Sequence, residues 1–338
     1  MKAVVTIGLD LAKRVFQVHG VDAAGATVVR KKLRRSEVMM FFAQLPPCRI
    51  GLEACATAHY WARELQVLGH EVRLMPPQYV KAYLKRHKND AADAEAICEA
   101  VQRPNMRFVP VKSAEQQSVL VLHRSRDLLV RQRTALVNAL RAHLAEFGIV
   151  EAQGLQNVGR LGEVIEDQAD TRVPELARAA ARVIVQQIEG LNCNIDAITV
   201  QIQTWHATAE VSRRLATIPG IGAVIASALA ATVPDPSVFA SSRAFAAWLG
   251  LVPRQNSSGG KDRLGRISKQ GNGYLRRLLI IGAQAALLRS KMLRAQPWVA
   301  ALLARKPRLV VAVALANKIA RIAWAIMTRG DTFRTAAT

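Results

Sequence analysis

The stretch "VVTIGLDLAKRVFQV", residues 4–18, decides the fold, because its apolar residues predict sheet strands and one acid, Asp10, stands among them. The first of these strands is apolar enough to lie inside a sheet. A carboxylate buried there is costly unless a positive group meets it. The partner of Asp10 is therefore the first question that the sequence raises.

Strand and helix signals alternate around this stretch, over residues 1 to about 110. Strands are predicted at 4–10, 15–22, 26–33, 48–55 and 71–77, with a hairpin at "DAAGA" (22–26). Helices are predicted at 36–45, 57–69 and 88–101, with Ser36 as the N-cap of the first and Gly69 closing the second. Three meandering strands followed by alternating strands and helices favour a mixed α/β sheet of the ribonuclease H kind.

Two long helices are predicted next. Residues 113–147 contain neither Gly nor Pro, and apolar residues recur at spacings of four and three from Ile184 to Trp205. This pattern favours an antiparallel coiled-coil hairpin or pairing with another subunit, and an ordinary helical core is the alternative. We expect an α/β domain of the ribonuclease H kind at 1–112, a helical linker at 113–209 and a mainly helical domain at 210–338.

The charge balance points to a polyanionic partner. The 338 residues include 47 Lys and Arg against 25 Asp and Glu, a formal net charge of +22. Such a surplus favours nucleic acid, although a merely basic enzyme is the alternative. The four cysteines (48, 55, 98 and 193) are expected to be reduced core residues of a cytoplasmic protein. The apolar segment 308–330 is interrupted by Asn317, Lys318 and Arg321 and is expected to be a core helix, not a membrane span.

Four acids form the first chemical constellation. Asp10 and Glu53 lie in predicted neighbouring strands, and Asp90 and Asp93 share one face of a predicted helix. Oxygen ligands of this kind suit Mg²⁺ or Mn²⁺, which can assist phosphoryl transfer. The alternatives are a salt bridge from Asp10 to a nearby cation, a surface position for Glu53 and a helix-dipole role for Asp90. Together the four favour a metal site that serves nucleic-acid chemistry.

The second constellation is the basic, glycine-rich segment 250–279. Ser257 and Ser258 precede two glycines, and either serine could attack a phosphodiester. A solvated basic loop is the alternative. Upstream, "IPGIG" (218–222) predicts a helix-hairpin-helix in which Gly220 and Gly222 present backbone N–H groups to phosphate, or else a plain helical turn. The basic residues expected to contact nucleic acid are Arg254, Lys261, Arg263, Arg266, Lys269, Arg276 and Arg277.

These motifs resemble the DEDD-type transposases of bacterial insertion sequences, relatives of the Piv invertase that are associated with bridge-RNA-guided recombination. The resemblance rests on "TIGLDLAK" (6–13), "GLEACA" (51–56), "KNDAADAEAI" (88–97) and "LGLVPRQNSSGGKDRLGRISKQGN" (249–272). It covers nearly the whole chain. It implies that Asp10, Glu53, Asp90 and Asp93 are the metal-binding carboxylates of a RuvC-like domain.

The same resemblance implies a mechanism and partners. It selects Ser258 as the nucleophile that forms a phosphoserine link to DNA, with Ser257 as the rival. It also implies donor and target DNA, a structured bridge RNA, and a homo-oligomer between dimer and tetramer in the bacterial cytoplasm at the nucleoid. Two other functions stay open: a RuvC-like structure-specific endonuclease that uses water, and a non-catalytic nucleic-acid-binding protein.

Overall fold

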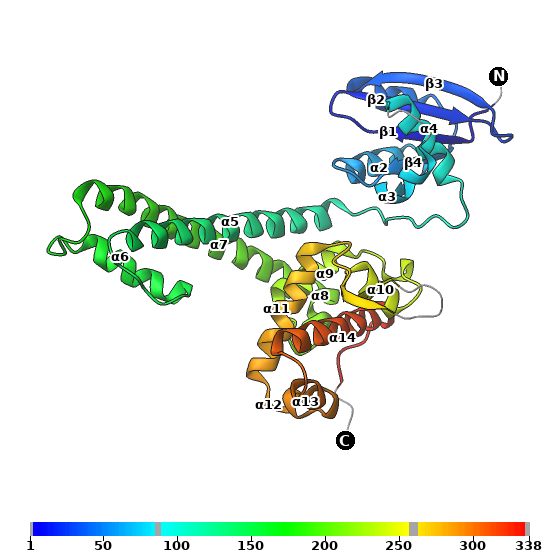
Figure 1. Ribbon diagram of the computed structural model, residues 1–338. Helices are drawn as coiled ribbons and strands as arrows, with labels where there is room; N and C mark the ends of the chain where they lie inside the picture. Colours follow the sequence, from blue (N-terminus) through cyan, green and yellow to red (C-terminus); the bar gives the residue numbers. More distant parts are fainter. Residues whose placement is uncertain (1–2, 85–88, 257–262, 335–338) are drawn as a thin grey trace. The chain divides into compact units, whose positions relative to one another are not determined.

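Five strands form a mixed sheet in the order β3-β2-β1-β4-β5 (Figure 1). The computed structural model describes residues 3–84, 89–256 and 263–334. β1, β4 and β5 are parallel, whereas β2 runs antiparallel to both of its neighbours. This confirms the mixed sheet expected from the sequence. The strands are β1 (Thr6–Asp10), β2 (Val15–Val21), β3 (Thr27–Arg34), β4 (Arg49–Glu53) and β5 (Glu71–Met75).

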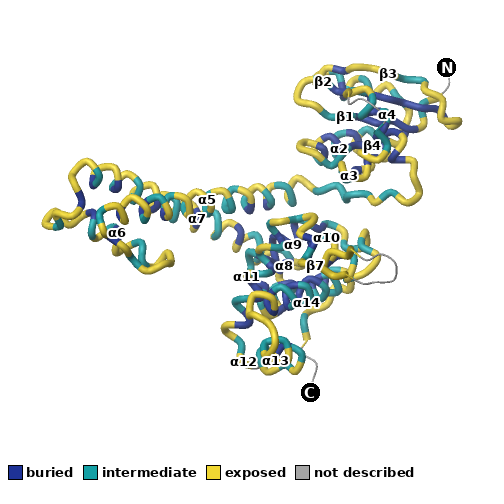
Figure 2. Tube along the Cα trace, viewed as in Figure 1, coloured by how far each residue is buried: buried dark blue, intermediate teal, exposed yellow. Residues whose placement is uncertain are grey.

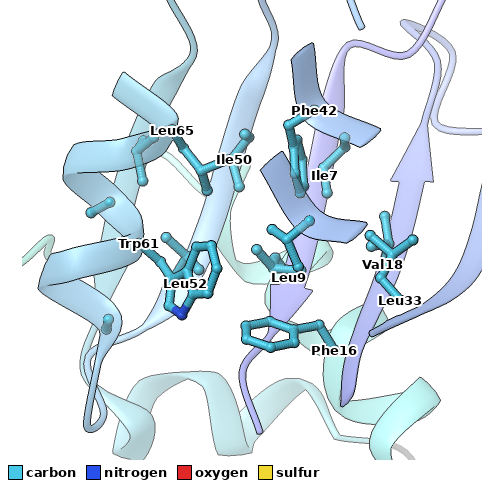
Figure 3. Close-up of a cluster of buried hydrophobic side chains, with 14 of the residues drawn as sticks. Ile7, Leu9, Phe16, Val18, Leu33, Phe42, Ile50, Leu52, Trp61 and Leu65 are labelled. Carbon is cyan, nitrogen blue, oxygen red and sulfur yellow. The ribbon is translucent and has the colours of Figure 1, made fainter. Parts of the chain in front are cut away.

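One face of the sheet packs against α1 (Val38–Ala43) and α2 (Ala58–Val67). Ile7 and Leu9 of β1 are fully buried there, in the same cluster as Trp61 of α2 (Figure 3). Side chains alternate across a strand, so Gly8 and Asp10 of β1 point to the opposite face. The first core therefore fixes which side of the sheet carries the acid.

The opposite face packs against α4 (Asp90–Val101), which approaches the strands at two glycines. Gly8 and Gly51 are register partners in the parallel pair β1 and β4. A Cβ on Gly8 would stand 2.1 Å from the carbonyl oxygen of Ala94, and one on Gly51 would stand 2.8 Å from Cβ of Val101. Real Cβ contacts are never that short, so only glycine permits this helix to lie so near the sheet.

The start of the first helix differs from the expectation. A 3-10 helix, Arg35–Glu37, precedes α1, so Ser36 lies inside a turn and is not the N-cap. The carboxylate of Glu37 accepts the backbone N–H of Arg34 at 2.7 Å instead. Gly69 does follow α2, with φ +88, as predicted. After β5 the chain forms α3 (Pro77–Val80) and a 3-10 helix (Lys81–Tyr83).

The two long helices are α5 (Ala114–Ala145) and α7 (Glu175–Thr208), and they run antiparallel. Arg126 donates to Thr199 at 2.8 Å, and Arg133, seven residues later, donates to Asn192, seven residues earlier, at 2.7 Å. The apolar residues that recur along α7 at spacings of four and three form a seam of two rows. One row is buried, and the other row is only half-buried. The buried row is Ala181, Ile188, Ile195 and Ile202.

The segment between these helices, in which the sequence gives only weak signals, contains a 3-10 helix (Leu155–Asn157) and α6 (Val158–Glu166). Arg178 of α7 is 3% exposed and satisfies carbonyl groups at the end of α6 and just after it. Its guanidinium donates to the carbonyl oxygens of Ile165, Asp167 and Asp170 at 2.5 to 2.8 Å. This charge stays buried because its N–H groups find acceptors.

The C-terminal part is mainly helical. It comprises α8 (Glu210–Leu215), α9 (Ala223–Thr232), a 3-10 helix (Pro236–Val238), α10 (Ser242–Trp248), β6 (Pro253–Gln255), β7 (Leu264–Ile267), α11 (Gly273–Arg289), α12 (Lys291–Ala295), α13 (Pro297–Leu303) and α14 (Arg308–Arg329). β6 and β7 form a small antiparallel sheet where the sequence suggested only a loop. The chain divides into two compact units, one from residues 1–117, 230–272 and 320–329 and the other from 118–229, 273–319 and 330–338.

α14 is the single helix in the described residues that is long and apolar enough to cross a membrane. Val311, Leu315 and Ile319 are buried along it at helical spacing, and Lys318 places its ammonium 4.5 Å from the ring of Trp298. This burial favours the core-helix interpretation.

The expectation for the cysteines was half wrong. All four are free, but only Cys48 and Cys98 are buried, whereas Cys55 and Cys193 are exposed.

Candidate functional site

Three carboxylates meet at the C-terminal end of β1. Asp10 is the last residue of that strand, and Asp90 and Asp93 lie in the first turn of α4. One carboxylate oxygen from each residue lies within 4.8 Å of the other two. Asp10 and Asp93 are half-buried, and Asp90 is exposed. A strand and a helix distant in the sequence thus bring three acids to one place.

Glu53 reaches the same edge through a repeated motif. β1 contains Ile-Gly-Leu-Asp at 7–10, and β4 contains Ile-Gly-Leu-Glu at 50–53. The two motifs pair in register from Ile7 with Ile50 to Leu9 with Leu52, so Asp10 and Glu53 end neighbouring parallel strands. Glu53 is not in the group within 4.8 Å, but it lies near enough to act on the charge of Asp10.

The first turn of α4 is fixed by its own cap. Asn89 precedes the helix in an extended conformation, and its side-chain oxygen accepts the backbone N–H of Ala92 at 2.8 Å. This bond satisfies one N–H group that the start of a helix leaves open. The helix therefore begins at Asp90, and the spacing of three directs Asp90 and Asp93 to the same side.

Asp10 lies in surroundings that disfavour its negative charge. The pKa of Asp10 is raised to about 6, chiefly by burial and then by the carboxylates of Asp93, Asp90 and Glu53, in that order. The backbone N–H of Leu11 opposes this rise in pKa. Like charges therefore outweigh any effect of nearby Lys or Arg, which disfavours the salt-bridge alternative for Asp10.

This donor set fits a divalent cation. Hard cations such as Mg²⁺, Mn²⁺ and Ca²⁺ prefer carboxylate oxygens, and a cation would relieve the repulsion that raises the pKa of Asp10. Asp10, Asp90 and Asp93 are the residues that would hold it, with Glu53 close to them. The three acids of this group offer only oxygen ligands, so the group favours oxygen-binding ions over zinc.

The predicted nucleophiles lie outside the described residues. Ser257, Ser258 and Lys261 fall between β6 and β7 in the sequence, and the structure does not describe them. The strands on either side are described, and they bring Asn256 and Arg263 together through the N–H of Asn256 and the carbonyl oxygen of Arg263 at 2.9 Å.

The predicted basic residues have varied surroundings. Arg254 donates to the carbonyl oxygen of Ser268 at 3.3 Å, and Arg277 pairs with Asp127, so part of its charge is compensated. Arg263, Arg266 and Lys269 are exposed, and Lys269 has the unusual φ of +56, whereas Arg276 is half-buried. Their contact with nucleic acid stays a prediction.

The two hairpin glycines differ from each other. Gly220 has φ +93, and a Cβ there would stand 2.8 Å from the carbonyl oxygen of Gly282 in α11. This glycine is therefore required by close packing between backbones. Gly222 is exposed just before α9 and has open space around it. Only Gly222 is free to approach a phosphate without disturbing that packing.

A buried polar chain of three residues was not expected from the sequence. His123 of α5 is 1% exposed, and its Nε2 lies 3.0 Å from Oγ of Ser227, while its Nδ1 lies 2.9 Å from the hydroxyl of Tyr274. The hydroxyl of Ser227 donates to the carbonyl oxygen of Ala223 at 2.6 Å, so it must accept from Nε2–H of His123. Nδ1 of His123 then accepts from Tyr274.

Comparisons with known proteins agree with one another along the chain. A sequence profile described as "Transposase IS116/IS110/IS902 family" matches residues 212–298, and one named DEDD_Tnp_IS110, described as "Transposase", matches 7–149. A Pseudomonas aeruginosa protein named "Probable family 20 transposase" is 50% identical over 97% of this chain and 98% of its own length. The transposase for insertion sequence element IS1328 of Yersinia enterocolitica is 44% identical over 98% of this chain and 99% of its own length. That for element IS1111A of Coxiella burnetii is 38% identical over the whole chain and 93% of its own length.

Proposed function

Because this chain belongs to the IS116/IS110/IS902 family of transposases, we propose that it cleaves and joins DNA strands at the carboxylates of Asp10, Glu53, Asp90 and Asp93. The observation that carries the proposal is the approach of three of these acids to within 4.8 Å. Acids that repel one another need a reason to stay together, and a divalent cation, Mg²⁺ or Mn²⁺, supplies one. The sheet and α4 belong, in this proposal, to a RuvC-like catalytic domain.

The chemistry divides between the cation and the chain. A cation bound here would stabilise negative charge on the reacting phosphodiester. Asp10 and Asp93 hold their oxygens in fixed positions because a strand and a capped helix carry them. Asp10 must also be deprotonated to act as a ligand, and its pKa of about 6 allows this at neutral pH. The chain thus provides positioning and negative charge.

The proposed nucleophile is Ser258, with Ser257 as its rival. The hydroxyl oxygen forms a bond to phosphorus, and one bridging bond between phosphorus and a sugar oxygen breaks. The departing oxygen takes a proton and leaves as a free hydroxyl, while the other DNA end stays joined to serine as a phosphodiester. Reversal of the same step by a hydroxyl of a different strand would complete strand transfer.

The experiment is capture of this adduct. Full-length protein is incubated with radiolabelled DNA from an insertion-sequence end and Mg²⁺, and the covalent complex is separated under denaturing conditions. We expect the adduct in wild type and in Ser257→Ala, and its loss in Ser258→Ala and in Asp10→Asn. Cleavage without adduct in Ser258→Ala would instead favour a nuclease that uses water. Unchanged recombination in Asp10→Asn would overturn the proposal altogether.

Sequence choice and assembly form the second half of the proposal. Phosphate contacts position a protein without specifying sequence, so base pairing by a structured bridge RNA would supply the choice of donor and target DNA. The net charge of +22 supports binding of both polymers, and the half-buried row of the α7 seam supports a homo-oligomer.

Sequencing of RNA that co-purifies with the protein, without nuclease treatment, tests for the guide RNA. Recovery of only unrelated cellular RNA, even in the presence of a complete element, would contradict it.

A further inference from the structure

A row of side chains crosses the sheet beside the carboxylates. Asp10 is the register partner of Gln17 in β2, and Gln17 is the register partner of Lys32 in β3. Directly opposed residues of neighbouring strands point to the same face. Lys32 therefore extends from the face that carries Asp10, two strands away, at roughly 10 Å by ordinary strand spacing.

The neighbours of Lys32 on β3 confirm which face of the sheet Lys32 lies on. Leu33 is buried in the core beneath α1 and α2, and the ammonium of Lys31 lies 5.2 Å from the ring centre of Phe41 in α1. Both residues therefore belong to the core side of the sheet. Because side chains alternate, Lys32 and its second neighbour Arg34 belong to the other side.

A contact on that other side agrees. Arg30, two residues before Lys32, pairs with Glu95 of α4 at 3.6 Å. Lys32 and Arg34 extend the same line toward the end of the sheet where Asp10 lies, and both are exposed. β3 is an edge strand, and Figure 2 shows most of it exposed. We call Lys32 and Arg34 the cation row.

The position of the cation row matters because the carboxylates alone repel a phosphodiester. Asp10, Asp90 and Asp93 concentrate negative charge at one end of the sheet. A DNA strand approaching them needs positive charge close by but outside the cluster. Unlike Arg30, neither member of the cation row forms an ion pair with an acid among the residues that the structure describes.

We propose that the cation row binds phosphates of the DNA strand that enters the carboxylate site. The inference rests on the proposed function, since it takes the reacting phosphate to lie at Asp10. At an axial rise of 3.4 Å per nucleotide, a distance of roughly 10 Å places the contact about three nucleotides from that phosphate. Lys32 and Arg34 thus hold the strand on one side of the reaction centre.

The test is equilibrium binding of full-length protein to fluorescent DNA from an insertion-sequence end, in EDTA, over a range of salt concentrations. Lys32→Gln is expected to lower the slope of log affinity against log salt by about 0.9, the value for one lost phosphate contact. Lys32→Arg is expected to restore it. Lys31→Gln is the matched control, because it removes the same charge from the adjacent residue on the opposite face and should leave the slope unchanged.

A second measurement locates the phosphate. Single phosphates on either side of the cleavage position are replaced in turn by neutral methylphosphonates. If Lys32 contacts one of them, that replacement and Lys32→Gln weaken binding by less than the sum of their separate effects. Additive effects at every position, or equal slopes for Lys31→Gln and Lys32→Gln, would overturn the proposal. Weakened binding to RNA but not to DNA would overturn the choice of a DNA strand.

The proposal and the proposed function fail separately. Binding in EDTA does not require the carboxylates to react. The lower salt slope expected for Lys32→Gln can therefore be found even if Asp10→Asn retains full recombination. Conversely, if Lys32→Gln binds like wild type while Asp10→Asn is inactive, only the cation row is wrong. Equal thermal unfolding of the variants excludes a general loss of folding.

Discussion

Gly8 of β1 lies so close to Cys98 of α4 that a Cβ atom on Gly8 would stand 2.4 Å from the backbone nitrogen of Cys98. This contact joins two backbones, so no rotation of a side chain can relieve it. The distance between strand and helix is set there, two residues before Asp10 in the chain. The spacing of the carboxylates therefore depends on a residue that carries no functional group.

Gly8→Ala is accordingly expected to displace α4 and to weaken Mn²⁺ binding while it destabilises the protein by about 1–3 kcal/mol, as overpacking does. Mn²⁺ binding is measured by calorimetry and stability by thermal unfolding. Gly190→Ala is the matched control. Gly190 lies within α7 with open space around it, so alanine should stabilise the helix by up to about 1 kcal/mol. Wild-type Mn²⁺ affinity in Gly8→Ala would show that the contact does not govern the site.

Metal affinity should depend on pH through Asp10. Its pKa is raised from 3.8 to about 6, so below pH 6 a proton must leave before an ion binds. Mn²⁺ affinity is expected to rise about tenfold per pH unit up to pH 6 and to level off above pH 7. Without metal, the stability of the fold changes with pH in the opposite direction to the metal affinity. The folded protein holds the proton more tightly than the unfolded chain, so the contribution of Asp10 is lost as pH rises from 3.8 through 6. A metal affinity that is constant from pH 5 to 8 would contradict the raised pKa.

His123 should make folding sensitive to acid. Burial, with a smaller effect of Arg126, lowers the pKa of His123 from 6.5 to about 4. The unfolded chain therefore binds a proton more readily between these values, and stability falls as pH decreases through this range, by on the order of 3 kcal/mol. Thermal unfolding from pH 7.5 to 4.5 measures the effect. His123→Ala should start with lower stability and show a weaker pH dependence, and an unchanged slope would assign that dependence to other groups.

The seam of α7 should be energetically uneven. Ile195 is 3% exposed in the buried row, whereas Val200, on the same helix, is 59% exposed. Ile195→Ala is expected to cost about 2–5 kcal/mol, as large-to-small changes in cores do. Val200→Ala should change stability by less than about 0.5 kcal/mol. Urea unfolding compares the two variants. A similar small effect for both would mean that α5 and α7 are held together mainly by other contacts.

Much of the end of the sheet that carries the carboxylates could be predicted from the sequence because its signals are local. Alternation identified β1 and β4, and the spacing of Asp90 and Asp93 put both acids on one side of a helix. The close approach of Gly8 to α4 could not be predicted from local signals, because it depends on which helix crosses the strand. The pattern Ile-Gly-Leu-acid, present in both β1 and β4, is a signal that could have revealed it.

Other features depend on contacts between distant segments. Arg178 is buried because carbonyl groups at the end of α6 and in the loop after it surround its guanidinium, which no pattern within α7 indicates. The hydrogen bonds of His123 likewise join three helices. The sheet of β6 and β7 is only three and four residues per strand, too short for a periodic signal. In each case the tertiary environment, and not local propensity, decides the outcome.

The register of β1 and β4 also protects the chain against misassembly. A shift of one strand by a single residue would turn Asp10 toward α2 and Leu9 toward the face that α4 covers, because side-chain direction reverses with every residue. The wrongly paired sheet would enclose a charge in its apolar interior and remove a leucine from that interior. The acids assigned to chemistry thus also select the correct strand alignment during folding, so their replacement by apolar residues removes a penalty that discriminates against the wrong sheet.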